Sequence, residues 1–251
     1  MIYKKGSVND CANYRPIGLL NHSYKILSVC ILTSRLMKET KWFLSDWQSG
    51  FRQLRGCRDN ILLLRVIYDN IIKGDTKCVV TFIDYAGAFD SISHKYLDAA
   101  LKNAGASRKT RALFRKIYAA AAGAARIQGL DGKTLLSKAF EICRGVIQGD
   151  IISPIFFILA LDQLMQAYDT KGTGIKVGTI RKMRVLGYAD DCTMLTTNTD
   201  IMTARLTTFA DASLHEADMK VKPSKTFSQH VCKQDPVEKP TDAEIAAKES
   251  T

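Results

Sequence analysis

Three aspartates carry the clearest chemical signal in this 251-residue sequence. Asp190 and Asp191 are adjacent between two short β-like stretches, and Asp84 directly follows a third such stretch. Carboxylates that meet at the end of one sheet repel one another. Mg²⁺ is the usual neutraliser, because it binds one or two carboxylates together with substrate phosphates. The chemistry that such a cluster predicts is phosphoryl transfer, although an acidic pair taken by itself is more often a solvated turn.

Strands and helices must position these aspartates. Lys77–Ile83 is rich in β-branched residues and predicts a strand that ends on Asp84. Arg184–Thr197 predicts two short strands joined at residues 189–191, a hairpin with the acidic pair at its tip. Apolar spacing and N-cap residues predict helices elsewhere. These are Tyr24–Met37, Asn60–Ile72, Ser91–Asn103 ending at Gly105, a helix capped by Ser107, a helix capped by Ser153 with Pro154 next, and Asp200–Ala217.

The composition favours a folded, basic protein. Lysine and arginine number 36 against 25 acidic residues, so the formal net charge of +11 predicts a polyanionic partner, either nucleic acid or an acidic membrane surface. The longest strongly apolar run, Ile151–Leu161, has 11 residues, whereas a membrane span needs about 20. Without a secretory pattern at the start, and with seven cysteines in no paired spacing, we expect an intracellular protein, nuclear or cytoplasmic.

Six short blocks, in a set order along the chain, change the interpretation of the acidic pair. They are Asn13–Ile17, Gln48–Arg52, Phe82–Asp90, Gly145–Asp150 followed by Ser153 and Pro154, Tyr188–Asp191, and Lys222–Thr226. Together they resemble the blocks of reverse transcriptases. The residues within these blocks are most similar to those of non-LTR (LINE-type) retrotransposons and more distantly similar to those of group II intron enzymes.

The resemblance implies an α/β (α+β) fold, in which the palm of a right-hand polymerase is an antiparallel sheet backed by helices. A mainly helical fingers region would occupy residues 1–76, the palm with motifs A to D residues 77–227, and a polar tail or linker residues 228–251. The thumb would be absent, and a full-length element would add thumb and endonuclease domains. The implied function is RNA-directed DNA synthesis, with an RNA template, a DNA primer and dNTPs as partners and no membrane partner.

The resemblance also assigns catalytic roles. Asp84 and Asp190 would be the main ligands of two Mg²⁺ ions, with Asp191 as the third carboxylate and Mn²⁺ as a possible substitute. The backbone carbonyl of Tyr85 would complete the site of the metal on the triphosphate. Lys225 would protonate the departing pyrophosphate.

Five further residues would bind the nucleotide. Lys4 and Arg15 would contact the triphosphate from the fingers, since ammonium and guanidinium groups form charge-assisted hydrogen bonds with phosphate. Phe89 would lie under the sugar and exclude a 2′-hydroxyl. Gln148 and Gly149 would line the pocket, where glycine lets the backbone approach the substrate closely.

Arg52 would order the fingers or contact the phosphates of the nucleic-acid template, and Asp90 would have a structural hydrogen-bonding role outside the metal set. Two positions depart from the usual pattern, because Gly87 stands where a polar residue is common and Ile147 where arginine is frequent. Two alternatives stay open. One is a catalytically decayed remnant that retains nucleic-acid binding; the other is a different palm-fold nucleotidyltransferase or cyclase, which would not explain the first two blocks.

Overall fold

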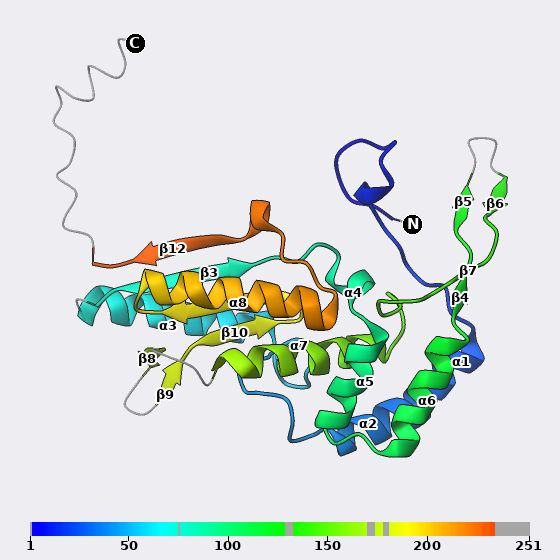
Figure 1. Ribbon diagram of the computed structural model, residues 1–251, viewed down its shortest axis with the longest axis horizontal. Helices are drawn as coiled ribbons and strands as arrows, with labels where there is room; N and C mark the ends of the chain where they lie inside the picture. Colours follow the sequence, from blue (N-terminus) through cyan, green and yellow to red (C-terminus); the bar gives the residue numbers. More distant parts are fainter. Residues whose placement is uncertain (1, 75, 129–132, 170–173, 178–180, 234–251) are drawn as a thin grey trace, which may run out of the picture.

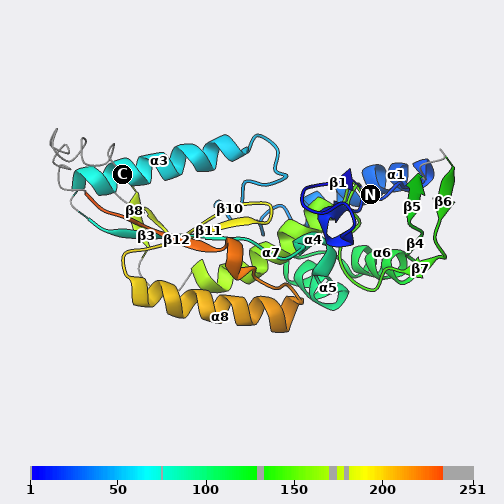
Figure 2. The ribbon, with the colours of Figure 1, turned by 90° about the horizontal axis from the view of Figure 1, so that it is seen from above.

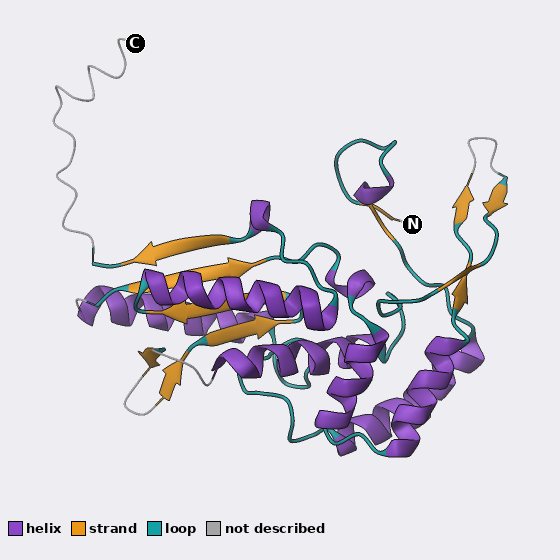
Figure 3. Ribbon diagram, in the orientation of Figure 1, coloured by secondary structure: helices purple, strands orange, loops and turns teal. Residues whose placement is uncertain are grey.

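A four-stranded antiparallel sheet forms the centre of the computed structural model, which describes residues 2–74, 76–128, 133–169, 174–177 and 181–233. The strand order is β10-β11-β3-β12 (Figures 1 and 3). The strands are β3 (Cys78–Ile83), β10 (Val185–Tyr188), β11 (Asp191–Thr196) and β12 (Phe227–Val231). The expected antiparallel palm sheet is confirmed.

The register of the central strands places the acidic residues. β3 pairs with β11 so that Ile83 lies opposite Cys192, and one further step along this register sets Asp84 beside Asp191. In the β10–β11 hairpin Tyr188 lies opposite Asp191, so that Ala189 and Asp190 form the turn. The predicted strand and the predicted acidic hairpin are both present, and their acidic residues meet at one end of the central strands β3 and β11.

Helices cover both faces of the sheet, with α3 on one face and α8 on the other (Figure 2). They are α3 (Cys57–Gly74), α7 (Ser153–Asp169) and α8 (Thr199–Ala217). Successive side chains of β3 point to opposite faces, as a strand requires. Cys78 and Val80 belong to the core on the α3 side, whereas Val79 and Ile83 belong to the larger core that includes α7 and α8.

A helical region lies beside the sheet and is built from two separate stretches of chain (Figure 1). Its elements are α1 (His22–Leu27), the π-helical η2 (Ser28–Thr33), α2 (Ser34–Glu39), α5 (His94–Asn103), α6 (Arg108–Ala119), and the strand pairs β4 (Ala122–Gly123) with β7 (Phe140–Glu141) and β5 (Arg126–Gln128) with β6 (Thr134–Leu136). The Glu39 carboxylate accepts hydrogen bonds from Ser107 N at 2.9 Å and Thr110 Oγ1 at 3.2 Å. These bonds tie the end of α2 to the start of α6.

The remaining elements are short. They are β1 (Ile2–Tyr3) paired with β2 (Tyr14–Arg15), η1 (Cys11–Asn13), α4 (Ala88–Ser91), β8 (Ile175–Val177) paired with β9 (Arg181–Met183), and η3 (Pro223–Lys225). Across the described ranges, every helix is too short or too polar to cross a lipid bilayer.

Two expected region boundaries differ from the structure. α3, expected among the fingers of residues 1–76, packs on β10, β8 and β12, and therefore belongs to the core of the sheet. The sheet also continues beyond residue 227, because β12 pairs with β3 as far as Val231. The expectation of a polar tail is wrong for residues 228–231, since the outer edge of β3 offers backbone partners to a polar segment. Residues 234–251 of that expected tail lie outside the described ranges.

Two helix starts also differ in detail. The helix expected over Ser91–Asn103 is interrupted, and α5 begins after Ser93, whose hydroxyl accepts a hydrogen bond from Tyr96 N at 3.1 Å. Ser153 is the first residue of α7 instead of its cap, and its hydroxyl lies 3.3 Å from Asp150 Oδ2, to which it donates. The predicted cap at Ser107 is confirmed by its 3.3 Å bond from Thr110 N.

Candidate active site

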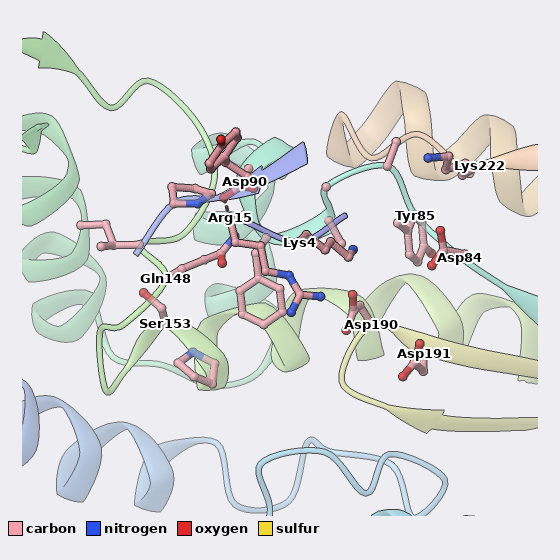
Figure 4. Close-up of a pocket in the computed structure, with 18 of the residues that line it drawn as sticks. Lys4, Arg15, Asp84, Tyr85, Asp90, Gln148, Ser153, Asp190, Asp191 and Lys222 are labelled. Carbon is pink, nitrogen blue, oxygen red and sulfur yellow. Dashed lines mark hydrogen bonds between the residues drawn. The ribbon is translucent and has the colours of Figure 1, made fainter. Parts of the chain in front are cut away.

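The predicted site residues converge on one pocket of about 580 Å³ at the end of the sheet (Figure 4). The pocket is lined by residues that the sequence placed in separate blocks: Lys4, Arg15, Asp84, Tyr85, Phe89, Gln148, Gly149, Asp190, Asp191 and Lys225. Among the predicted residues only Arg52 is outside this described lining. Asp90 and Lys222 also line the pocket, although the sequence interpretation gave neither a role in binding substrate.

The carboxylates at this edge repel one another. Burial raises the pKa of Asp191 above its ordinary value, and the neighbouring charges of Asp190 and Asp84 raise it further. Asp84 Oδ2 is buried without a hydrogen bond to any described residue, while Lys225 Nζ lies 3.4 Å away as an ion-pair partner. Excess negative charge in a partly desolvated place attracts a cation.

A divalent metal fits the chemistry of this carboxylate set, but the described residues do not form a finished coordination site. No group of three or more histidine, cysteine or acidic side chains is close enough there to bind one ion together. The unsatisfied Asp84 oxygen and the repulsion acting on Asp191 are the features that a cation would relieve.

The backbone around Asp84 is held by the residues on either side of η3. Lys222 N donates to the Asp84 carbonyl at 2.8 Å, and Thr226 Oγ1 accepts from Asp84 N at 3.3 Å. Tyr85 forms an isolated antiparallel bridge with Val221 and is not hydrogen-bonded to it, so its own carbonyl faces away from that segment. The role of the Tyr85 carbonyl as a metal ligand stays a prediction.

Phe89 is packed from two sides. Its ring stacks on Phe157 of α7 with a centroid distance of 4.2 Å and an interplanar angle of 17°, and Phe51 approaches edge-on at 6.3 Å. Gly87, one of the positions that departs from the family pattern, adopts a φ of +64° just before α4. A side chain there would be strained, so glycine suits this turn.

The loop before α7 forms hydrogen bonds with Asp90 of α4 and with Gly18 of the N-terminal segment. Gln148 Nε2 donates to Asp90 Oδ1 at 2.8 Å, which orients the amide at the pocket wall. Burial raises the pKa of the Asp90 carboxyl, while the bond from Gln148 lowers it. Gly149 has a φ of +104°, and a Cβ there would be 2.8 Å from the Gly18 carbonyl oxygen. Gly18 N in turn donates to the Gln148 carbonyl at 2.6 Å, so glycine is required on steric grounds.

Lys4, which directly follows β1, and Arg15 of β2 line the pocket (Figure 4). Their charges interact, because the nearby Arg15 is the largest cause of the lowered pKa of Lys4, followed by burial and the charge of Lys225. Arg52 has a different environment. Its Nη1 donates to the carbonyls of Ser45 at 2.6 Å and Gln48 at 3.0 Å, which orders the loop that carries it.

Gln48 is the site residue that sequence reasoning missed. It belongs to a block that was recognised, but no role was given to it there. The structure buries its amide against Ala189, the first residue of the acidic turn, across 141 positions of sequence. The block Gln48–Arg52 was the available sequence signal for a functional residue, but it does not indicate the contact between Gln48 and Ala189.

The fold is that of right-hand polymerases. The chain matches apo telomerase from Candida tropicalis with a TM-score of 0.57 at 12% identity, over 85% of this chain and 44% of that one. It matches telomerase from Candida albicans with a TM-score of 0.53 at 14% identity, over 82% of this chain and 35% of that one. At these identities the likeness concerns the fold.

Residues 2–239 match the family model described as reverse transcriptase (RNA-dependent DNA polymerase), and the chain belongs to that family. Its relatives include the Pol polyprotein of type-2 retrotransposable element R2DM from Drosophila melanogaster, 30% identical over 71% of this chain and 16% of the relative. Another is the R2 Pol polyprotein of Popillia japonica, 29% identical over 84% of this chain and 29% of the relative. The predicted retrotransposon reverse transcriptase domain is confirmed, and the chain spans less than a third of these relatives.

Proposed function

We propose that this chain carries the nucleotide-adding site of an RNA-directed DNA polymerase. The observation that carries the proposal is that Asp84, Asp190 and Asp191 share one pocket with the cations Lys4 and Arg15. A pocket that holds carboxylates and basic side chains together suits a metal-bound triphosphate. RNA template, DNA primer and dNTPs are the proposed partners, and these place the reaction inside a cell.

The reaction is an in-line displacement. The primer 3′-hydroxyl loses its proton to solvent water and its oxygen forms a bond to the α-phosphorus of the dNTP. The bond from that phosphorus to the oxygen bridging to the β-phosphate breaks, and pyrophosphate leaves. Two divalent cations, Mg²⁺ or Mn²⁺, would supply Lewis-acid activation of the primer hydroxyl and neutralise phosphate charge when bound. Asp84, Asp190 and Asp191 would hold them.

The other residues bind and orient the substrate. Lys4 and Arg15 neutralise the triphosphate and set its direction. Phe89 presents its ring to the sugar, and Gln148, held by Asp90, forms the pocket wall. Lys225, already beside Asp84, donates a proton to the leaving pyrophosphate.

Primer extension tests the proposal. The chain is incubated with an RNA template, an annealed DNA primer, dNTPs and Mg²⁺, alongside Asp190→Asn and the control Asp211→Asn, whose carboxylate is exposed on α8. Extension by wild type and by Asp211→Asn, with a loss of about 10²-fold or more in Asp190→Asn, supports it. Equal extension by Asp190→Asn overturns the assignment of the hairpin.

Binding separates this proposal from the decayed remnant. The wild type and a triple alanine variant of Asp84, Asp190 and Asp191 should both bind a primer–template duplex, with affinity that falls steeply as salt rises. A wild type that binds in this way but never extends the primer would favour the remnant. Thumb and endonuclease domains, expected in a full-length element, belong to the same proposal.

A further inference from the structure

The acidic turn has an unusual backbone at its first residue. Ala189 has a φ of +55°, in the left-handed region that residues with a side chain seldom adopt, and it is 6% exposed. The next two residues are Asp190 and Asp191. Any relaxation of this turn would move both carboxylates, so an interaction that holds the Ala189 backbone also determines where they point.

The Gln48 side chain supplies that interaction. Its Oε1 accepts hydrogen bonds from Ala189 N at 3.1 Å and from Gly50 N at 2.8 Å, and its Nε2 donates to the Ala189 carbonyl at 3.3 Å. Gln48 is fully buried. One amide thus pairs with both backbone groups of a single turn residue, in the way a neighbouring strand would.

The backbone on either side of Gln48 pairs with β10. Gly187 N donates to the Trp47 carbonyl at 2.9 Å, and Ser49 N donates to the Gly187 carbonyl at 2.8 Å. The edge strand of the sheet is thereby covered by the loop that precedes α3. Contact is close enough that a Cβ on Gly187 would be 2.7 Å from the Trp47 ring.

We infer that Gln48 is a positioning residue, which holds Ala189 in its left-handed conformation and so directs Asp190 and Asp191 into the pocket. The chemical reason is specific to glutamine. An ionised glutamate can accept from Ala189 N but cannot donate to its carbonyl, and methionine has the right length with no hydrogen bonds. The consequence for metal binding rests on the proposed function, whereas the contact with Ala189 does not.

Amide hydrogen exchange measured by NMR tests the contact directly. In Gln48→Met, exchange at Ala189 N should be at least tenfold faster, while exchange at Gly187 N, which is bonded to the Trp47 carbonyl, stays within twofold of wild type. The matched control is Gln166→Met. Gln166 is a partly buried glutamine of α7 that donates to the Phe43 carbonyl and Asp162, away from the turn, so its loss should leave Ala189 unchanged.

Two results would overturn the inference. One is unchanged exchange at Ala189 in Gln48→Met; the other is equal acceleration at Ala189 and Gly187, because that shows a general loosening of the loop. If Gln48→Met fails to fold, Gln48→Glu serves instead. It keeps the acceptor for Ala189 N and loses the donor, so exchange at Ala189 should stay within threefold of wild type and a larger increase contradicts the inference.

Metal binding tests the consequence. Tb³⁺, a luminescent substitute for divalent cations, is titrated into wild type, Gln48→Met, Gln166→Met and Asp190→Asn. The signal lost in Asp190→Asn defines the site, and Gln48→Met should bind that site at least fivefold more weakly than Gln166→Met at similar thermal stability. Equal affinity overturns the directing role. Absence of any Asp190-dependent signal counts against the proposed function, and the exchange experiment still decides the role of Gln48.

Discussion

Lys225 Nζ lies 3.4 Å from Asp84 Oδ2, at the oxygen that has no hydrogen bond among the described residues. The lysine comes from η3, and the same segment holds the Asp84 backbone through Lys222 N. The ammonium group therefore lies next to this carboxylate as a positive charge. Because the two side chains are 40% and 34% exposed, the pair itself stabilises the fold little.

Removing this charge should have opposite effects on binding and on chemistry. In Lys225→Met, Asp84 loses a competing cation, so Tb³⁺ or Mg²⁺ affinity is expected to rise about two- to fivefold. Primer extension should fall about 10²-fold, since the proposed proton donor is gone. Lys222→Met, which removes an exposed pocket lysine, is the control and should change neither the metal affinity nor the rate of primer extension. Weaker metal binding in Lys225→Met contradicts the competition.

Phe89 is expected to select the sugar. A valine at this position leaves room for a 2′-hydroxyl, so in Phe89→Val the ratio of kcat/KM for dNTP over rNTP should fall about tenfold or more while metal binding is retained. Steady-state extension with each nucleotide measures the ratio.

Phe157→Leu separates this role from core packing. It removes the ring that stacks on Phe89 but leaves the Phe89 side chain in place. The free energy of unfolding should drop by about 1 to 3 kcal/mol, while the ratio of kcat/KM for dNTP over rNTP is largely preserved. If Phe89→Val loses activity with both nucleotides equally, Phe89 is a packing residue.

Gly50 is expected to tolerate no side chain. A Cβ at this position would be 2.2 Å from Ala189 N, so in Gly50→Ala either the loop or the acidic turn must move. We expect a loss of about 1 to 3 kcal/mol in the free energy of unfolding and at least tenfold slower extension. Gly56→Ala is the control, because no described atom lies within 4 Å of its Cβ position, and it should be neutral or slightly stabilising. Wild-type behaviour of Gly50→Ala in urea unfolding and extension would contradict the close packing.

Asp162 should make the fold less stable as pH rises. Burial raises its pKa to about 6, although Ser45 and Gln166 donate hydrogen bonds to its Oδ2. The native state thus holds this proton more tightly than the unfolded state. The stabilisation is complete below about pH 4 and is lost as pH rises through about 6.

Asp162→Asn removes this titration. The difference in the free energy of unfolding, Asp162→Asn minus wild type, should increase by about 2 to 3 kcal/mol as the pH rises from 4 to 7.5. Urea unfolding at a series of pH values measures the difference. For Asp211→Asn, at an exposed carboxylate, the free energy of unfolding should depend on pH in the same way as in wild type. Parallel curves for Asp162→Asn would show that the Asp162 carboxyl is not desolvated.

Local signals predicted the elements that carry the chemistry. β-branched residues identified the strand before Asp84, and two apolar runs around an acidic turn identified the β10–β11 hairpin. Both signals depend on neighbours in sequence, as does the cap at Ser107. β12 was missed because Phe227–Val231 is polar and becomes a strand through the backbone groups that β3 presents to it.

The sequence by itself determined the family, the carboxylates and most of the pocket residues, since these are read from residue types in short blocks. Only the tertiary structure decided which surfaces those blocks meet. Periodicity predicts that α3 is a helix but not that it covers the sheet, and no pattern around Gln48 indicates that its amide pairs with Ala189. Such contacts join positions distant in the chain, and they form because buried apolar surface and backbone hydrogen bonds must find partners in the folded molecule.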